Sequence, residues 1–175
     1  MGGVVLVEDE SRIEFEAQQE RIWAPRGVYP KLEITGEKTG HCFYGATNVF
    51  TGVHIIHEAE WMTSGETVRF LQKVKKHYQK RLQKKVKVLL IWDGAPIHRG
   101  EVKGFLKDNY EWLEIMYFPA YSPELNPEEW MWNEAKDAVC KNHEENDFAE
   151  LAYQFYHYLI THMLKPSFCK KILAF

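Results

Sequence analysis

Two nearly unbroken apolar runs constrain the fold more than any other feature of this 175-residue sequence. Val4 to Val7 is followed by a group of acids, and Val86 to Trp92 stops at Asp93. Runs of this length that are rich in β-branched and aliphatic residues are typical of strands buried on both faces of a sheet. We therefore expect a sheet with two such strands near its centre and helices covering both faces.

The rest of the pattern supplies neighbours for these strands. Three more strands are expected, over His41–Thr47, Val53–Glu58 and Leu113–Phe118. Helices are expected over about 63–82, 101–109, 127–141 and 147–164, and residues 11–39 are turn-rich and indicate a loop or hairpin. This order predicts an α/β fold: a mixed five-stranded sheet with right-handed crossovers and helices on both faces, an arrangement that resembles the ribonuclease-H-like fold.

Composition narrows the class of protein. With 45% hydrophobic and 14% aromatic residues, the chain is expected to fold as one domain, not to be disordered. Cys42, Cys140 and Cys169 are too far apart for a CxxC pair, which favours a reducing compartment. Met1 to Glu10 lack the basic end and apolar stretch of a signal peptide. The stretch Leu151–Leu164 is too short and polar to span a bilayer, so we expect a cytoplasmic protein without a membrane segment.

Acids that follow the two central strands are the first candidate functional groups. Functional groups collect beyond the carboxyl ends of neighbouring strands, so Asp9 and Asp93 converge if their strands are adjacent. Close carboxylates repel unless a cation lies between them, which favours Mg²⁺ or Mn²⁺. The alternative is that each aspartate is solvated or caps a turn. Alternation places Glu8 and Glu10 on the opposite strand face from Asp9, which makes them secondary candidates.

A third acid comes from the start of the helix at about 127. Asn126 suits the N-cap, Pro127 the first helical position, and Glu129 the place of a capping-box glutamate. Helical periodicity does not decide whether Glu128 or Glu129 reaches the site.

Three segments carry a resemblance to a known family: Asp9 to Ser11 (DES), Trp92 to His98 (WDGAPIH) and Tyr121 to Trp132 (YSPELNPEEWMW). They resemble the catalytic domain of mariner-superfamily DDE transposases of the bacterial insertion-sequence type. By position the resemblance identifies the triad as Asp9, Asp93 and Glu129, with thirty-five residues between the last two. It extends over about residues 4–141 and includes the segment from Trp23 to Gly27. Gly94 stands where the family usually has asparagine.

The resemblance implies a function and its requirements. The triad would hold two Mg²⁺ or Mn²⁺ ions, cleave a DNA phosphodiester at a transposon end and join the freed 3′-hydroxyl to target DNA. His98 would be an auxiliary residue that positions a phosphate or water. Double-stranded DNA is the implied partner, and a homodimer is plausible for the joining of two ends. The helix-turn-helix domain that recognises element ends in the family is expected to be absent from this single catalytic domain.

Charge gives a further candidate surface. The formal net charge is −3, yet residues 73–87 hold eight of the 22 basic side chains. Such a run is often a solvated helix face, but it can also contact DNA phosphates. The candidate contacts are Lys73, Lys76, Lys80, Arg81 and Lys84. The competing functions are a ribonuclease-H-type nuclease and a catalytically silent remnant that binds DNA or a protein. Nucleotide-cofactor motifs are absent from the sequence.

Overall fold

A computed structural model of the chain describes residues 3–15, 25–28, 39–81, 86–120, 122–141 and 143–173. The strands are β1 (Val4–Glu14), β2 (Gly40–Asn48), β3 (His54–Ala59), β4 (Val88–Trp92) and β5 (Leu113–Tyr117). The α-helices are α1 (Ser64–Arg81), α2 (Glu101–Asn109), α3 (Pro127–Ala135), α4 (Phe148–Thr161) and α5 (Pro166–Ile172). Two 3₁₀ turns, η1 (Pro96–His98) and η2 (Pro123–Leu125), and one π-helix, η3 (Lys136–Cys140), complete the described elements.

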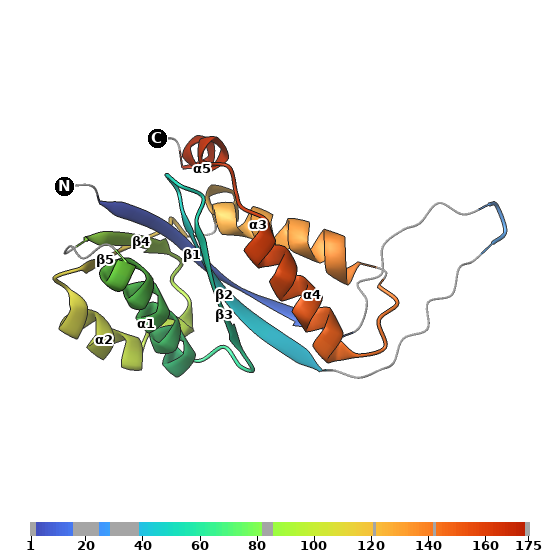
Figure 1. Ribbon diagram of the computed structural model, residues 1–175, viewed down its shortest axis with the longest axis horizontal. Helices are drawn as coiled ribbons and strands as arrows, with labels where there is room; N and C mark the ends of the chain where they lie inside the picture. Colours follow the sequence, from blue (N-terminus) through green and yellow to red (C-terminus); the bar gives the residue numbers. More distant parts are fainter. Residues whose placement is uncertain are drawn as a thin grey trace.

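The five strands form one mixed sheet in the order β3-β2-β1-β4-β5 (Figure 1). The first three pair antiparallel, whereas β4 runs parallel to both β1 and β5. Parallel neighbours need crossover connections, and α1 and α2 provide them. The predicted mixed five-stranded α/β sheet is confirmed.

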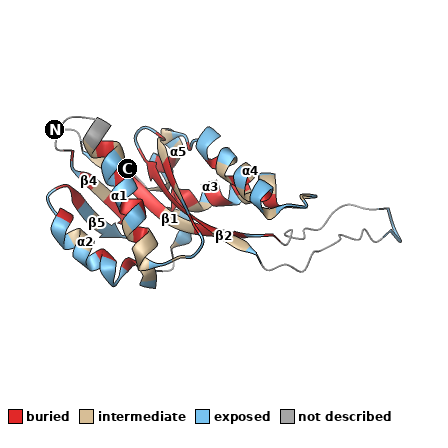
Figure 2. Cartoon of the chain, turned by 60° about the horizontal axis from the view of Figure 1, so that its bottom comes forward, coloured by how far each residue is buried: buried red, intermediate tan, exposed pale blue. Residues whose placement is uncertain are grey.

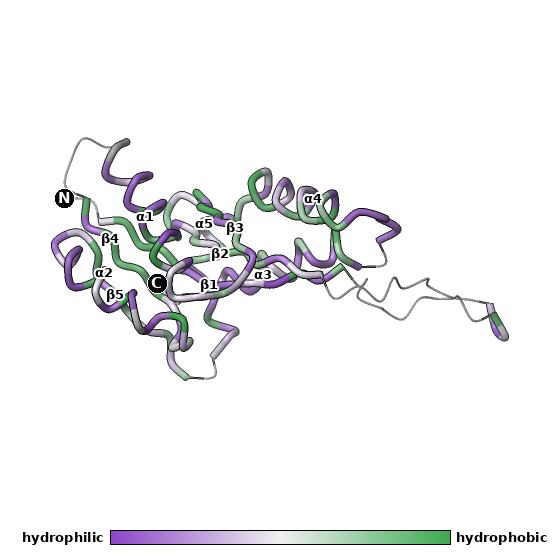
Figure 3. The backbone as a smooth tube through the Cα atoms, turned by 90° about the horizontal axis from the view of Figure 1, so that it is seen from below, coloured by the Kyte–Doolittle hydropathy of each residue, from purple (hydrophilic) through white to green (hydrophobic). Residues whose placement is uncertain are grey.

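Helices cover both faces of the sheet, as expected (Figure 1). On one face Phe70 and Leu71 of α1 pack with Leu6, whereas Val7 packs on the other face with Trp132 of α3. Successive residues of β1 thus enter different cores, because side chains of a strand alternate between faces. Figure 2 shows the buried residues along the central strands, and Figure 3 shows the hydrophobic strands between helices with hydrophilic stretches.

The observed boundaries correct several expectations. β1 continues to Glu14 well past the apolar run, because residues 6–14 pair with β2. Asp9 therefore lies within a strand and not after its end. The expected helix over 147–164 is two helices, since α4 ends at Thr161 and Pro166 begins α5. Trp23 and most of the turn-rich segment lie outside the described residues.

Two further expectations concern the chain as a whole. Among the described residues, no helix is both long and apolar enough to cross a membrane. All three cysteines are buried free thiols.

Candidate active site

Strand register brings the two aspartates to one level of the sheet. The parallel ladder between β1 and β4 ends with Val7 opposite Ile91, and both side chains enter the core beneath α3. Asp9 and Asp93 each come two residues later in their chains. With a side-chain period of two, Asp9 points to the same face as Val7. Asp93 follows the carboxyl end of β4, and its Oδ1 accepts a hydrogen bond of 2.8 Å from the backbone N–H of Ala95.

Helix α3 supplies the glutamate. Asn126 is the N-cap, and its side chain accepts a hydrogen bond of 3.1 Å from the N–H of Glu128. The backbone N–H of Asn126 donates instead to the carbonyl of Pro123 at 2.9 Å. That bond occupies the group that a capping-box glutamate would bind, so Glu129 is not engaged in a capping box. Its carboxylate faces the cavity described next.

Asp9, Asp93 and Glu129 line one cavity of about 410 Å³, which we call the acidic cavity. Its other walls come from the loop between β5 and α3 and from the turn after β4. They are formed by Gly94, Phe118, Pro119, Ala120, Ser122, Pro123 and Asn126. Three acids from β1, the end of β4 and α3 therefore face a common space large enough for part of a nucleotide.

Electrostatics in the acidic cavity favour a cation. Burial, followed by the nearby charges of Glu129, Glu10 and Glu128, raises the pKa of Asp9 to about 8. Its Oδ2 is buried and has no hydrogen-bond partner within the described part of the chain. Carboxylate oxygens are the ligands that Mg²⁺ and Mn²⁺ prefer, and a cation would offset this repulsion. The three acids thus fit a divalent metal site.

Glu128 points away from the acidic cavity, into the core between α3 and the sheet. Its side chain is fully buried, and its Oε2 lies 3.1 Å from Nε2 of His54, whose side chain is only 2% exposed. Nδ1 of His54 donates to the carbonyl of Leu159 at 3.3 Å. The two glutamates that periodicity could not separate therefore occupy different environments.

A cluster of buried polar groups lies on the other face of β1, where Glu8 and Glu10 point. The ring of His98 stacks on Trp92 with centroids 4.0 Å apart, and its Nδ1 donates to the backbone carbonyl of Asp93 at 3.0 Å. Its Nε2 lies 2.9 Å from Oε1 of Glu10 and 3.6 Å from Oε2 of Glu8. His98 thus links the strand that carries Asp9 to the turn that carries Asp93.

The charges of this cluster depend on one another. Burial lowers the pKa of His98, but its hydrogen bond to Glu10 and the nearby negative charges outweigh that effect and leave the pKa raised. Burial, Glu10 and the aspartates raise the pKa of Glu8 well above its usual value. Ligand atoms of Glu8, Glu10 and His98 lie within 4.8 Å of one another, so this set could also hold a cation. Sequence alternation placed the two glutamates on this face but gave no sign of their histidine partner.

The basic run is partly placed by the structure. Lys73 and Lys76 are exposed on α1, whereas Lys75 donates to Oδ1 of Asn109 at 2.6 Å. The run leads into the amino end of β4, and Asp93 follows the carboxyl end of that strand. The side chains of Lys80, Arg81 and Lys84 lie outside the described residues. The expected DNA contact of this surface stays a prediction.

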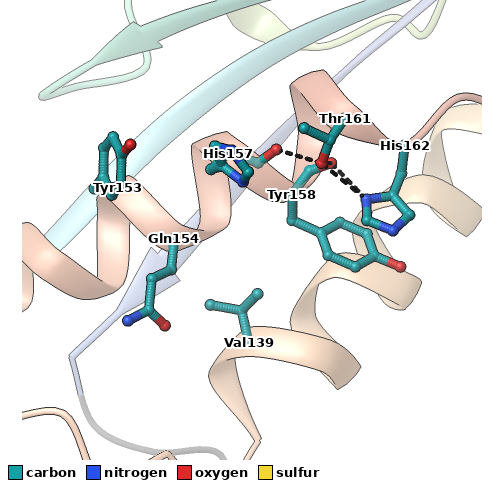
Figure 4. A pocket seen from close by; sticks show the side chains of 7 residues that line it. All are labelled: Val139, Tyr153, Gln154, His157, Tyr158, Thr161 and His162. Carbon is teal, nitrogen blue, oxygen red and sulfur yellow. Dashed lines mark hydrogen bonds between the residues drawn. The ribbon is translucent and has the colours of Figure 1, made fainter.

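Four other histidines lie in pairs close in sequence, and none of them belongs to a cluster of three or more metal-ligand side chains among the described residues. His54 pairs with Glu128 on one sheet face, and Nε2 of His57 lies 2.9 Å from Glu66 on the other. His157 and His162 both line a cavity of about 330 Å³ between η3 and α4, where the ring of His162 stacks on Tyr158 (Figure 4). No carboxylate lines that cavity in the described part of the chain, which makes it a poor site for a hard cation.

The chain is similar in sequence to known proteins. A family model described as DDE superfamily endonuclease matches residues 4–152. The insertion element IS630 uncharacterized 39 kDa protein of Shigella sonnei is 25% identical over 158 residues, which cover 90% of this chain and 45% of that protein. The chain therefore spans about half the length of this curated relative.

Solved structures share the fold. The mariner Mos1 paired end complex with Mg has a TM-score of 0.72 at 14% identity, over 98% of this chain and 51% of that chain. The catalytic domain of Mos1 mariner transposase has a TM-score of 0.61 at 13% identity, over 97% of this chain and 75% of that chain. These likenesses confirm the expected ribonuclease-H-like fold.

Proposed function

The chain belongs to the DDE superfamily endonucleases, and on that premise we propose that it is the catalytic domain of a DNA transposase. In this proposal it cleaves a phosphodiester bond at a transposon end and then transfers the freed 3′-hydroxyl to target DNA. The observation that carries the proposal is the convergence of Asp9, Asp93 and Glu129 on the acidic cavity. The insertion-element relative supports the same biological setting.

The proposed ligands of the metal are the carboxylates of Asp9, Asp93 and Glu129. Two bound divalent ions would activate the attacking water or 3′-hydroxyl and stabilise the leaving oxygen. The surrounding residues hold these carboxylates in position. The Asn126 cap fixes the first turn of α3 and so holds Glu129, while the N–H of Ala95 and the ring of His98 hold the turn that bears Asp93. His98 is thus proposed as a positioning residue.

The proposed partner is double-stranded DNA, both as transposon end and as target. The Mos1 structures include a paired end complex and a strand transfer complex of that protein. By analogy we propose that two copies of this chain act together when two ends are joined. Sedimentation of the chain with and without end-containing DNA would test this, since a dimer should form at least on the DNA.

A cleavage assay with two substrates and a metal-free control tests the proposed activity. The 175-residue chain is incubated with duplex DNA, with an RNA/DNA hybrid or with either substrate plus EDTA, in Mg²⁺ or Mn²⁺. We expect DNA cleavage that needs the metal and is lost in Asp93→Asn. Cleavage of the hybrid alone would replace the proposal with a ribonuclease-H-type nuclease. Binding of DNA without any cleavage would instead identify a silent remnant.

A further inference from the structure

A second pocket adjoins the acidic cavity on the side of α2. It has a volume of about 390 Å³, and Gly94 lines both spaces. Gly94 is exposed, and a Cβ added there would meet no atom within 4 Å, so the surface between the two spaces is open. A strand lying in the acidic cavity could therefore continue over Gly94 into this neighbouring space, which we call the basic pocket.

The basic pocket carries two cations. Arg99 follows η1, and Lys103 lies in the first turns of α2. Both side chains are exposed, and neither forms an ion pair or a side-chain hydrogen bond within the described ranges. Gly100 joins the two elements with a φ of 60°, a left-handed conformation that favours glycine and sets the sharp turn between them.

No acid among the described residues lines the basic pocket. Two acids are close to this lining along the chain. Asp93 precedes Gly94 and lines the acidic cavity, where its Oδ1 accepts a hydrogen bond from the N–H of Ala95. Glu101 is turned toward α1: its carboxylate oxygens lie 3.7 and 3.9 Å from the place that a Cβ added to Gly65 would take. The histidine in the wall, His98, is buried and engaged by Glu10. The charged side chains that line the basic pocket are therefore the cations Arg99 and Lys103, which suits an anion.

An aromatic side chain completes the wall. Tyr117 ends β5 and is 57% exposed, with its ring 6.4 Å from that of Trp92. Exposed aromatic rings beside cations are a common platform for nucleic-acid bases, because every base has a face that can stack. Beside the acidic cavity, the two cations could thus bind a phosphate, and the exposed ring could stack on the base of the same nucleotide.

We propose that Arg99 and Lys103 bind a backbone phosphate of the DNA strand that passes through the acidic cavity, next to the phosphate that is cleaved. The inference rests on the proposed function and extends it by giving the path of the strand along the carboxyl ends of β4 and β5. Lys87, the last residue of the basic run, precedes the amino end of β4, about 17 Å from the carboxyl end of that five-residue strand. Arg99 and Lys103 are better placed to contact DNA at the cleaved bond.

Salt dependence of DNA binding gives the first test. Binding of a short fluorescent duplex to the 175-residue chain is measured over a range of KCl concentrations. We expect R99A/K103A to reduce the slope of log affinity against log salt by about two, since each lost phosphate contact removes about one. K107A is the matched control, because Lys107 is an exposed cation of α2 that does not line the basic pocket. An unchanged slope in R99A/K103A would overturn the proposal.

Replacing single phosphates of the DNA by uncharged methylphosphonates shows which phosphate Arg99 and Lys103 contact. Duplexes that carry one methylphosphonate at successive positions around the cleaved bond are compared for the wild type and R99A/K103A. We expect one neighbouring position to weaken the wild type while causing no further loss in the variant. Equal losses in both proteins at every position would refute the assignment. If the wild type binds DNA but never cleaves it, the proposed function fails. The methylphosphonate series measures binding affinity, so it still shows whether Arg99 and Lys103 contact a phosphate.

Discussion

Removal of the Glu128 carboxylate should destabilise the protein far more than removal of its neighbour's. In Glu128→Ala, Nε2 of His54 loses a carboxylate oxygen 3.1 Å away in a site where both side chains are at most 2% exposed. The two atoms are at ion-pair distance, although neither has a hydrogen bond among the described residues. Breaking a buried ion pair costs about 3–5 kcal/mol, because the remaining partner is left without compensation. Against a total stability of about 5–15 kcal/mol, that is a large fraction.

Urea denaturation followed by circular dichroism measures this loss. With an m-value of about 2 kcal/mol/M, the expected cost moves the midpoint down by about 2 M. Glu129→Gln is the matched control. It is expected to change the free energy of unfolding by less than about 0.5 kcal/mol, because it removes a charge that repels Asp9 and breaks no buried pair.

A double variant separates the pair from the cavity that truncation leaves. His54→Leu with Glu128→Leu should recover most of the stability lost in either single variant, because two apolar side chains leave no unpaired polar group. The reasoning would be refuted if Glu128→Ala lost less than about 1 kcal/mol, or if the two leucine substitutions were simply additive.

Three further predictions concern the packing of Gly45, the proposed metal site and the buried cysteines. Gly45→Ala places a Cβ 2.8 Å from the Trp132 ring, so a thermal melt should show a loss of about 1–3 kcal/mol, and an unchanged melting temperature would contradict that close approach. Mn²⁺ at 100 times its Kd should stabilise the wild type by about 2.7 kcal/mol but not Asp93→Asn, and equal shifts in both would place the ion elsewhere. Burial raises the pKa of Cys140 and of Cys169 to about 11 from a reference of 9.0. Each thiol therefore favours the folded state below pH 9, and stability to urea should fall as the pH rises from 9 toward 11, whereas a rise would contradict their burial.

The pattern of apolar residues in the sequence predicts most of the strands and helices. The run that ends at Trp92 is a central strand, and its carboxyl end delivers Asp93, because a doubly covered strand must be apolar along its whole length. The same rule underestimated β1. Glu8, Asp9 and Glu10 interrupt the apolar run, yet they are strand residues paired with β2. Acids inside a strand oppose the local apolar pattern, and their place in the strand is shown only by its pairing with β2.

The sequence does not predict those contacts of the site that join residues far apart in the chain. Helix-start signals at Asn126 and Pro127 were correct, but they left Glu128 and Glu129 open because the two differ only in their tertiary contacts. The contact between His98 and Glu10 joins residues 88 positions apart, which no periodicity encodes. No sequence pattern marks Arg99, because it is a single cation outside any basic run. The turn at Gly100 brings it beside Lys103 in the fold.

The most direct test of the central claim is nicking of supercoiled plasmid DNA by Glu129→Gln and Glu128→Gln, normalised to the folded fraction of each protein. If Asp9, Asp93 and Glu129 form the catalytic metal site, Glu129→Gln abolishes Mn²⁺-dependent nicking, whereas Glu128→Gln retains it. Normal nicking by Glu129→Gln together with loss of nicking in Glu128→Gln would contradict the assignment of the acidic cavity as the active site.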